Sequence, residues 1–380
     1  MNVLISAGEA SGDLHGARLL SALRAARPDL SAFGMGGHRL ESAGLERVAR
    51  SESVAVVGFS EVFEKLPQLA RALGSLAKEA RLRRPAAAVL IDFPDFHGLL
   101  SKRLKRERVP IVYYVSPQVW AWRPWRARRI ARRARRIITL FPFEAEIYRR
   151  FGADAVCAGH PLVEDVREGL AAPSPLPPKT RRRLVLLPGS RSAEVERHWG
   201  ILSEAASRLA RRMDLEVVAA RAPGLSEELF AGTMKRGITL VSTGLHPLLA
   251  SADLAFVSSG TATLEAALCG APMVVVYKTS RVSYWIARSL VTVPWIALVN
   301  IVAGEEIVPE LIQGECTVER LEKEGERILS SPSRIETMKA GLARVAGELG
   351  PPGASARAAG YVLSAIQPLR MTSDVYRVAQ

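Results

Sequence analysis

The sequence has little cysteine, little lysine and no long apolar run. Only 3 of its 380 residues are cysteine and none forms a Cys-x-x-Cys pair, which argues against a disulfide framework and predicts reduced, packed thiols. The longest apolar stretch, Leu290–Ala303, contains Pro294 and Asn300 and is shorter than the roughly 18 residues that span a bilayer. The first apolar run, Val3–Ala7, is too short for a signal peptide and follows no basic residue. We therefore expect a cytoplasmic protein that is soluble or bound peripherally to a membrane.

Patterns that bind metal ions are also missing from the sequence. Its six histidines are dispersed, and it has no Asp-x-Asp pair and no His/Cys cluster with metal-ligand spacing. The sequence thus predicts neither a required metal nor another cofactor.

Positive charge is abundant and unevenly placed. The chain has 52 basic and 38 acidic side chains, a net charge of +14, and 43 of the basic residues are arginine. Residues 1–170 contribute +10, residues 171–183 contribute +4, and residues 184–380 sum to zero. The first half is expected to face an anionic partner: nucleic acid, anionic lipid or a phosphorylated substrate. Hydrophobic residues make up 48% of the chain, which excludes bulk disorder.

The chain pattern predicts an α/β protein with two doubly wound parallel-sheet domains. Short apolar β-rich runs alternate with helical stretches, as in parallel sheets covered on both faces. Four prolines in residues 168–183 are typical of an extended linker. We predict a first domain over 1–170, a linker over 171–183, a second domain over 184–350, and a closing helix and tail over 351–380. The expected strands are Val3–Ala7, Ala32–Met35, Val54–Val57, Ala87–Asp92, Pro110–Val115, Ile137–Leu140, Leu184–Leu187, Glu216–Ala219, Thr239–Val241, Leu254–Val257 and Met273–Tyr277.

Small and acidic residues follow the first predicted strand. Gly8, Glu9, Ser11 and Asp13 lie in a turn before a helix, and His15 follows one turn later. Such a turn lets the backbone approach a ligand and offers free N–H groups at the helix start. The alternative is a tight strand–helix turn in which Ser11 or Asp13 caps the helix.

A second acidic turn follows the strand that ends near residue 91. Asp95 lies between Phe93 and Phe96, so we expect it to be partly desolvated, with a raised pKa suited to a general base. Asp95 could instead cap the following helix. Asp92 is expected to be structural.

Tryptophan and arginine are concentrated in residues 120–136. Trp120, Trp122 and Trp125 lie beside Arg123 and Arg126, and six more arginines follow. Indoles at a membrane interface with arginines on lipid phosphates would use this segment. Single-stranded nucleic acid is the rival ligand, and a solvated basic helix with core indoles is the structural alternative.

Two turns in the second half could hold a nucleotide. In the first turn Gly189 and Ser190 precede Arg191, whose planar guanidinium can clamp a phosphate. In the second turn the hydroxyl-rich segment around Ser259, Gly260 and Thr261 opens a helix, as in many pyrophosphate sites. Glu265 lies one turn into that helix, on the same face as Thr261, where it could accept both hydroxyls of a ribose. Ordinary helix capping is the alternative for both turns.

Taken together, these segments resemble the lipid-A-disaccharide synthase family, whose members are inverting GT-B glycosyltransferases. The matching segments are SAGEASGD (6–13), IDFPDF (91–96), YVSPQVWAWR (114–123), GHPL (159–162), LLPGSR (186–191), SGTATLEAALCGAPMVVVYK (259–278) and VPELIQGECT (308–317). The resemblance implies two Rossmann-like domains that face each other across a cleft. It also implies transfer from UDP-2,3-diacylglucosamine to 2,3-diacylglucosamine 1-phosphate (lipid X), giving a β-1,6 disaccharide 1-phosphate and UDP in lipid A biosynthesis.

The resemblance also implies roles for the residues singled out above. Inversion is a single displacement, which needs one base on the acceptor hydroxyl and charge stabilisation on the departing UDP. Asp95 would be the base, with Glu9 and Asp13 as further catalytic candidates and Glu9, Asp13 or His15 as the alternative base. Arg191 with the turn at 259–261 would hold the pyrophosphate. Glu265 would bind the ribose. The residues expected at the reacting sugars are Gly8, Glu9, Ser11, Asp13 and His15.

The resemblance extends to partners, and it has one departure. It implies a homodimer, an anionic inner-membrane leaflet that contacts the Trp/Arg segment, and no nucleic acid. The family usually has Leu-Pro-Asn where this chain has Leu298-Val299-Asn300. Asn300 is kept as a donor-site candidate, although the loop lacks the proline that would restrict φ. The alternatives are another UDP-sugar enzyme of this architecture, such as an epimerase or a transferase to another lipid-linked acceptor, and a basic nucleic-acid-binding protein.

Overall fold

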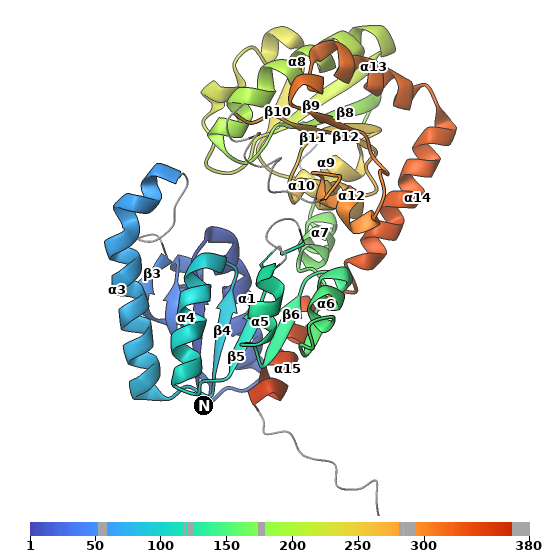
Figure 1. Cartoon of the computed structure of the whole chain (residues 1–380). Helices are drawn as coiled ribbons and strands as arrows, with labels where there is room; N and C mark the ends of the chain where they lie inside the picture. The colour runs from blue at the N-terminus through green and yellow to red at the C-terminus, as the bar shows by residue number, and fades with distance from the viewer. Residues whose placement is uncertain are drawn as a thin grey trace, which may run out of the picture. The chain divides into compact units, whose positions relative to one another are not determined.

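The structure, a computed structural model, divides into two compact units. It describes residues 1–51, 59–117, 119–120, 125–173, 179–280, 284 and 293–366. The first unit comprises Met1–Gly159 together with the chain from Gly353 onward, and the second comprises His160–Pro352 (Figure 1).

The first unit is built on a seven-stranded parallel sheet of order β3-β2-β1-β4-β5-β6-β7. Its strands are buried apolar runs, as a sheet covered on both faces requires. All five residues of β4, for example, are buried. The strands are β1 (Asn2–Ala7), β2 (Ser31–Gly36), β3 (Glu46–Arg50), β4 (Ala87–Ile91), β5 (Ile111–Tyr114), β6 (Arg136–Thr139) and β7 (Ala155–Cys157).

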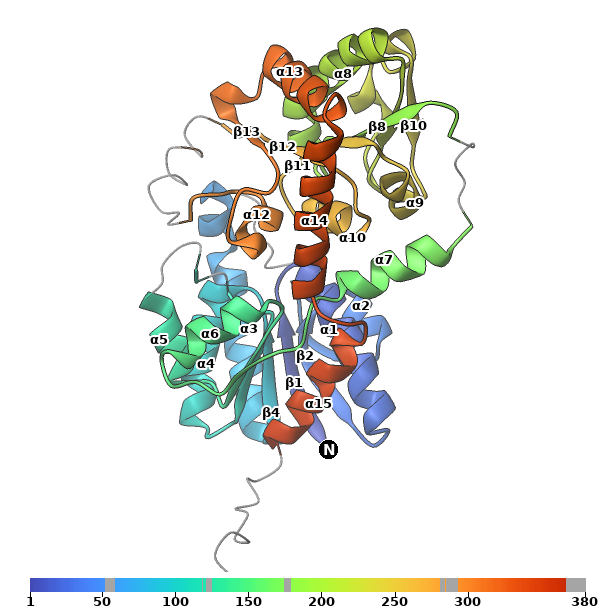
Figure 2. The same cartoon turned by 90° about the vertical axis from the view of Figure 1, so that its right-hand side faces the viewer.

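Helices cover both faces of this sheet. Helices α3, α4, α5 and α6 pack on one face, where Phe33, Leu90, Leu100 and Tyr148 belong to one apolar core. Helix α15 packs against α1 and contacts β5 and β6 (Figure 2). The helices are α1 (Ala10–Ala26), α2 (His38–Ser42), α3 (Phe59–Arg83), α4 (Pro94–Arg106), α5 (Trp125–Ala131), α6 (Pro142–Arg149) and α15 (Ala354–Ile366).

The second unit has a six-stranded parallel sheet of order β10-β9-β8-β11-β12-β13. Its strands are β8 (Arg182–Leu187), β9 (Leu215–Ala220), β10 (Ile238–Val241), β11 (Leu254–Ser258), β12 (Met273–Tyr277) and β13 (Glu310–Ile312). Its helices are α7 (Leu162–Ala171), α8 (Ser192–Met213), α9 (Leu245–Ala250), α10 (Ala262–Leu268), α12 (Leu298–Ala303), α13 (Val318–Leu329) and α14 (Pro332–Glu348). Short 3₁₀ turns lie at η2 (Glu227–Phe230), η3 (Met234–Arg236) and η4 (Gln313–Glu315).

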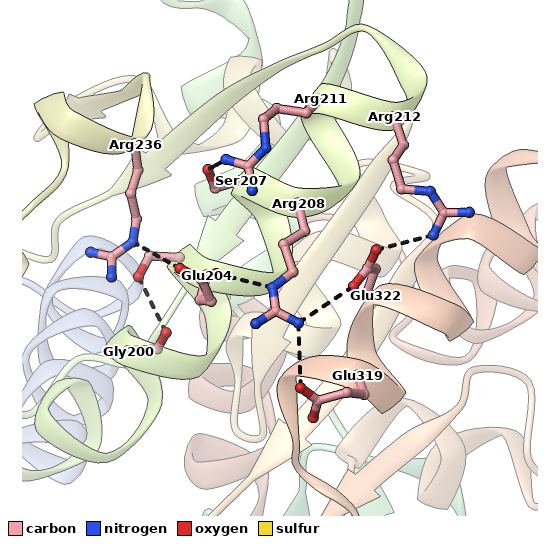
Figure 3. A network of polar contacts seen from close by, with 10 residues as sticks. Gly200, Glu204, Ser207, Arg208, Arg211, Arg212, Arg236, Glu319 and Glu322 are labelled. Atoms are coloured by element: carbon pink, nitrogen blue, oxygen red, sulfur yellow. Dashed lines mark hydrogen bonds and ion pairs between the residues drawn. The ribbon is translucent and has the colours of Figure 1, made fainter.

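An ion-pair network joins α8 to α13 in the second unit. Arg208 lies 3.0 Å from Glu204 on its own helix and 3.3 Å from Glu319 on α13. Arg212 lies 3.1 Å from Glu322, which also faces Arg208 (Figure 3). Shared partners keep these long side chains ordered, which isolated surface pairs rarely achieve.

Most of the predicted elements occur where the sequence places them, and the differences have simple reasons. Strands β3, β7 and β13 were not predicted; all three lie at sheet edges and at most one residue of each is buried, so they lack the apolar run of an inner strand. The expected strand at Val54–Val57 lies outside the described residues. The basic helix considered for the segment at 120–136 corresponds, within the described residues, to α5 (Trp125–Ala131).

The units divide at Gly159/His160 and Pro352/Gly353, whereas the sequence suggested a linker at 171–183. Helix α7 belongs to the second unit because it packs on α9 and α10. Gly169 lies so close to His246 that a Cβ would fall 2.0 Å from the imidazole Nδ1.

Candidate functional site

The predicted motifs follow the strands at which the strand order of each sheet reverses. In the first unit β1 lies between β2 and β4, and the motifs at 6–13 and 91–96 follow β1 and β4. In the second unit β8 lies between β9 and β11, and the motifs at 186–191 and 259–265 follow β8 and β11. In open α/β sheets, ligands bind at the carboxyl ends of the strands at such switch points.

The turn between β4 and α4 has an unusual backbone. Asp92 and Phe93 both have left-handed φ values, 52° and 56°, which cost energy for residues other than glycine. The Asp92 N–H donates to the Val115 carbonyl at 3.3 Å. The Phe93 ring lies over Gly8, where a Cβ would fall 2.2 Å from the ring. Gly8 therefore allows the two motifs of the first unit to pack together.

His97 also joins these motifs, and sequence reasoning missed it. Its side chain is fully buried, and burial lowers its pKa to about 4. Its Nδ1 is hydrogen-bonded to the Asp92 carbonyl, so Nδ1 carries the proton. Its Nε2 therefore accepts from the Ser6 hydroxyl, 2.9 Å away. A histidine on the buried face of the helix after an acidic turn was the only signal in the sequence.

A pocket of about 290 Å³ opens beside this turn. Three carboxylates, those of Glu9, Asp92 and Glu144, line it together with Arg126. Burial and the charge of Glu9 raise the pKa of Asp92 to about 6. Burial raises the pKa of Glu144 to about 7, although its carboxylate accepts hydrogen bonds from the Trp120 indole and two backbone N–H groups. Such a pocket can bind hydroxyl groups and exchange protons with them.

The expectation that Asp95 is desolvated is wrong. Its side chain is 72% exposed and forms an ion pair with Arg126. The flanking rings turn inward and stack on each other at 5.3 Å between the centroids of Phe93 and Phe96. The rings therefore leave Asp95 in solvent, whereas burial desolvates Asp92. Asp92, expected to be structural, is the carboxylate that faces the pocket.

The remaining residues of the first motif have different surroundings. Both carboxylate oxygens of Asp13 accept backbone N–H groups at the start of α2, from Gly37 at 2.7 Å, Arg39 at 3.0 Å and Leu40 at 3.1 Å. This capping arrangement explains the conformation of the turn before α2. Glu9 and Ser11 are exposed, and the His15 ring meets that of Tyr114 edge-on.

The tryptophan segment is only partly described. The Trp120 indole donates to the buried Glu144 carboxylate at 3.0 Å, so its polar edge faces the pocket wall. Trp125 is 56% exposed. Trp122 and Arg123 lie outside the described residues.

The turn after β8 is held by an acidic side chain of α8. Gly189 has φ 132°, and a Cβ there would fall 2.6 Å from Glu194. The Glu194 carboxylate accepts from the Ser190 N–H and from the Arg191 guanidinium, both at 3.0 Å. Arg191 is otherwise 77% exposed, so its remaining donors face solvent. Backbone N–H groups and an exposed guanidinium at a helix start are an arrangement that can bind an anion.

His198 supports the turn after β8 much as His97 supports the turn between β4 and α4. Sequence reasoning missed His198 as well. Its Nδ1 lies 2.8 Å from the Pro188 carbonyl, and its Nε2 accepts the Lys278 N–H at 3.0 Å. Burial lowers the pKa of His198, so the neutral ring bridges the ends of β8 and β12.

The hydroxyl-rich turn after β11 is partly occupied by internal contacts. The Ser259 hydroxyl donates to the Ile296 carbonyl at 3.1 Å, Gly260 has φ 154°, and Thr261 immediately precedes α10. The Glu265 carboxylate lies 3.3 Å from the His246 Nε2. His246, on α9, was not recognised from the sequence, because 19 residues separate it from Glu265.

Asn300 is buried and fully engaged within the protein. Its amide donates to the Val308 carbonyl and to Glu310, both at 2.9 Å, and its oxygen accepts the N–H groups of Ile307 and Val308. These bonds use the amide to fasten α12 to the segment before β13. Helix α12 begins at Leu298 without the family proline, and Val299 is buried.

The structure thus places the predicted motifs after β1 and β4 at one switch point and those after β8 and β11 at the other, one cluster in each unit. Within the described ranges, no group of three or more His, Cys, Asp or Glu side chains could hold a metal ion. No helix in the described part of the chain is long and apolar enough to cross a membrane.

Comparison with known proteins matches nearly the whole chain to one family. A family model described as lipid-A-disaccharide synthetase matches residues 3–354. A lipid-A-disaccharide synthase of Myxococcus xanthus (strain DK1622) is 43% identical over 384 residues, covering 97% of this chain and 98% of its own. One of Solibacter usitatus (strain Ellin6076) is 40% identical over 377 residues, covering 95% and 97%.

Solved structures match the fold. The calicheamicin glycosyltransferase CalG4 superposes with a TM-score of 0.65 at 15% identity, covering 97% of this chain and 99% of that one. The UDP-GlcNAc 2-epimerase of Neisseria meningitidis superposes with a TM-score of 0.62 at 12% identity, covering 96% and 100%. The predicted GT-B architecture of two Rossmann-like parallel-sheet domains is confirmed.

Proposed function

Because the chain belongs to the lipid-A-disaccharide synthetase family, we propose that it is a glycosyltransferase that makes the lipid A disaccharide. The donor is UDP-2,3-diacylglucosamine, the acceptor is 2,3-diacylglucosamine 1-phosphate, and the products are the β-1,6 disaccharide 1-phosphate and UDP. The observation that carries this proposal is the pairing of family membership with two switch-point clusters, one acidic and one suited to phosphate.

The second unit is proposed to bind the donor. The turn after β8 offers the Ser190 N–H and the exposed Arg191 guanidinium to a pyrophosphate. The Ser190 N–H donates to the Glu194 carboxylate, so an entering phosphate would displace Glu194 as the acceptor or share this N–H with it. Glu265 would accept the ribose hydroxyls while His246 holds the other side of its carboxylate.

The first unit is proposed to bind the acceptor and supply the base. The acceptor 6-hydroxyl must lose a proton as its oxygen attacks the anomeric carbon and the bond to UDP breaks. Asp95 is the proposed base, and its ion pair with Arg126 places it at the edge of the acidic pocket. Glu9 and Asp92 would bind sugar hydroxyls in that pocket. Asp13 is proposed to act on the reaction indirectly, by holding the turn before α2 that its carboxylate caps.

The protein is further proposed to act as a homodimer at the inner face of an anionic membrane. The excess positive charge of residues 1–183 supports this proposal, because the acceptor carries a phosphate and lies among anionic lipids.

The test is UDP release from UDP-2,3-diacylglucosamine, measured with and without the monophosphate acceptor in detergent. Acceptor-dependent release together with a disaccharide product is the expected result. Release without acceptor would indicate a hydrolase or an epimerase-like enzyme. Transfer to a water-soluble acceptor at an equal rate would contradict the proposed substrate.

A further inference from the structure

A cationic groove lies between α4 and the segment formed by α5 and the turn after it. It has a volume of about 460 Å³, and its lining contains one aromatic side chain, five basic side chains and no acidic one. The lining residues are Lys105, Trp125, Arg128, Arg129, Arg132 and Arg133. Helices α4 and α5 cover the same face of the sheet (Figure 1). The reaction proposed above uses none of these residues.

The groove is held in shape by hydrogen bonds that tie its two walls together. The Arg133 guanidinium donates to the Gly98 carbonyl at 2.7 Å and lies 3.2 Å from the Ser101 hydroxyl. The Lys105 ammonium donates to the Arg132 carbonyl at 2.8 Å. These bonds go to neutral acceptors, so the positive charge of the groove is not cancelled by them. An anion entering the groove would meet several preplaced donors.

The aromatic and apolar side chains distinguish this groove from a purely electrostatic patch. Trp125 is 56% exposed, and the guanidinium carbons of Arg126 and Arg129 lie 5.6 and 5.1 Å from its ring centroid. Leu99 on α4 is 58% exposed, one residue after the carbonyl that binds Arg133. An exposed indole and leucine beside arginines are typical of surfaces that lie in the headgroup region of a bilayer.

Helix α5 contributes side chains to both the groove and the acidic pocket. Arg126 lines the pocket and pairs with Asp95, whereas Arg128 and Arg129 line the groove. Each residue turns about 100° around a helix axis, so Arg128 points about 160° away from Arg126, whereas Arg129 lies only about 60° from it. The two hollows therefore adjoin each other along α5. A membrane held by the groove would therefore lie beside the pocket.

We propose that this groove docks the protein on a membrane by binding phosphate headgroups of anionic phospholipids. The proposal rests on the proposed function only in that an acceptor with acyl chains lies in a membrane. Nucleic acid fits less well, because base stacking needs a free indole face and guanidinium groups already lie over Trp125. Headgroup phosphates need only the cationic donors that line the groove, and the acyl chains beneath them need only a site for shallow apolar contact.

The test is binding of the full chain to vesicles, which requires no turnover. Vesicles of phosphatidylcholine with phosphatidylglycerol are compared with pure phosphatidylcholine in a flotation assay. We expect binding to the anionic vesicles only, weakened by high salt. Arg128→Glu with Arg129→Glu should weaken it about tenfold or more. The neutral pair Arg128→Gln with Arg129→Gln should give an intermediate loss.

The matched control carries the same change of charge elsewhere. Arg167→Glu with Lys339→Glu alters two exposed cations of the second unit and should bind as the wild type does. Thermal unfolding checks that each variant is folded. Equal binding by the groove and control variants would overturn the proposal, as would complete displacement from vesicles by inorganic phosphate or tighter groove-dependent binding of a single-stranded oligonucleotide. Vesicle binding without sugar transfer would contradict the proposed function and leave the groove proposal standing.

Discussion

Two aspartates three residues apart in one turn have opposite surroundings. Asp92 is turned into a pocket by its left-handed backbone, whereas Asp95 in the first turn of α4 remains in solvent beside Arg126. A carboxylate that must take a proton from a substrate hydroxyl needs access to that hydroxyl more than burial in the free enzyme. The exposed Asp95 side chain meets this requirement in the proposed mechanism, and Asp92 lines the pocket beside it.

Replacing Asp95 and Glu265 should separate catalysis from donor binding. Asp95→Asn is expected to lower kcat about 100-fold or more, because general base catalysis contributes factors of that order, and to leave UDP affinity unchanged. Glu265→Ala is expected to weaken UDP binding instead, measured by calorimetry. Each variant is the control for the other. Full activity in Asp95→Asn would move the role of base to Glu9 or Asp92.

Glu144 should make the folded protein less stable as pH rises. Its folded pKa of about 7 lies above the ordinary value of 4.5, so the folded state holds the proton more tightly than the unfolded state. The resulting stabilisation is present below about pH 4.5 and is lost as pH rises through 7. The shift corresponds to about 3 kcal/mol.

Glu144→Gln isolates this effect from that of the buried histidines, which acts in the opposite direction. Unfolding free energies of both proteins, measured by urea titration from pH 5 to pH 8, should show the wild type losing stability relative to the variant. A constant difference across this range would contradict the assignment.

At the scale of elements, the turn between β4 and α4 is held by groups distant in the sequence. His97 links the Asp92 carbonyl to Ser6 of β1, and the Phe93 ring lies on Gly8. The left-handed conformation of Asp92 and Phe93 costs of order 1–3 kcal/mol for each residue and persists because these contacts determine it. His97 is therefore a positioning residue for Asp92 and Asp95.

Substitution of His97 should reveal this role. His97→Leu removes both hydrogen bonds and is expected to reduce kcat about tenfold to a hundredfold, because small displacements of reacting groups have effects of that size. His97→Asn can still donate to the Asp92 carbonyl and should retain more activity. UDP affinity, measured in parallel, should not change in either variant. A uniform loss of UDP binding and turnover would instead indicate general unfolding.

At the scale of the whole molecule, the chain crosses between the units twice. After the second unit it returns, and α15 packs on α1 with Ala358 and Val362 buried. Arg136 donates to the Tyr361 carbonyl at 3.2 Å, and Arg357 donates to the Ala158 carbonyl at 2.9 Å. The first unit is therefore completed by residues more than 190 positions beyond the rest of it.

Loss of α15 should destabilise the first unit. A chain ending at Pro352 is expected to lose at least about 2 kcal/mol of unfolding free energy, from the exposed apolar face and the two lost arginine bonds. Val362→Asp should act in the same direction at full length. Gly360→Ala, at an exposed position with open space around it, should be neutral or slightly stabilising. A melting temperature that is unchanged in both of the first two variants would contradict this role of α15.

The amino-acid sequence by itself determined most of the elements, the two parallel-sheet domains and the motifs at the strand ends. These features depend on neighbours in the chain: apolar runs of strand length, glycine after a strand, and capping residues before a helix. The same local signals located Gly189, Arg191 and Glu265 at the ends of adjacent strands.

Only the tertiary structure decided which groups are buried and which residues meet. Asp92 is desolvated, and Asp95 is not, because of atoms that come from distant parts of the chain. The same is true of the hydrogen bonds that Asn300, His97 and His246 form. The return of α15 to the first unit likewise follows from the apolar face that α1 presents to it. Burial and hydrogen-bond geometry are properties of the packed molecule, so no local pattern could specify them.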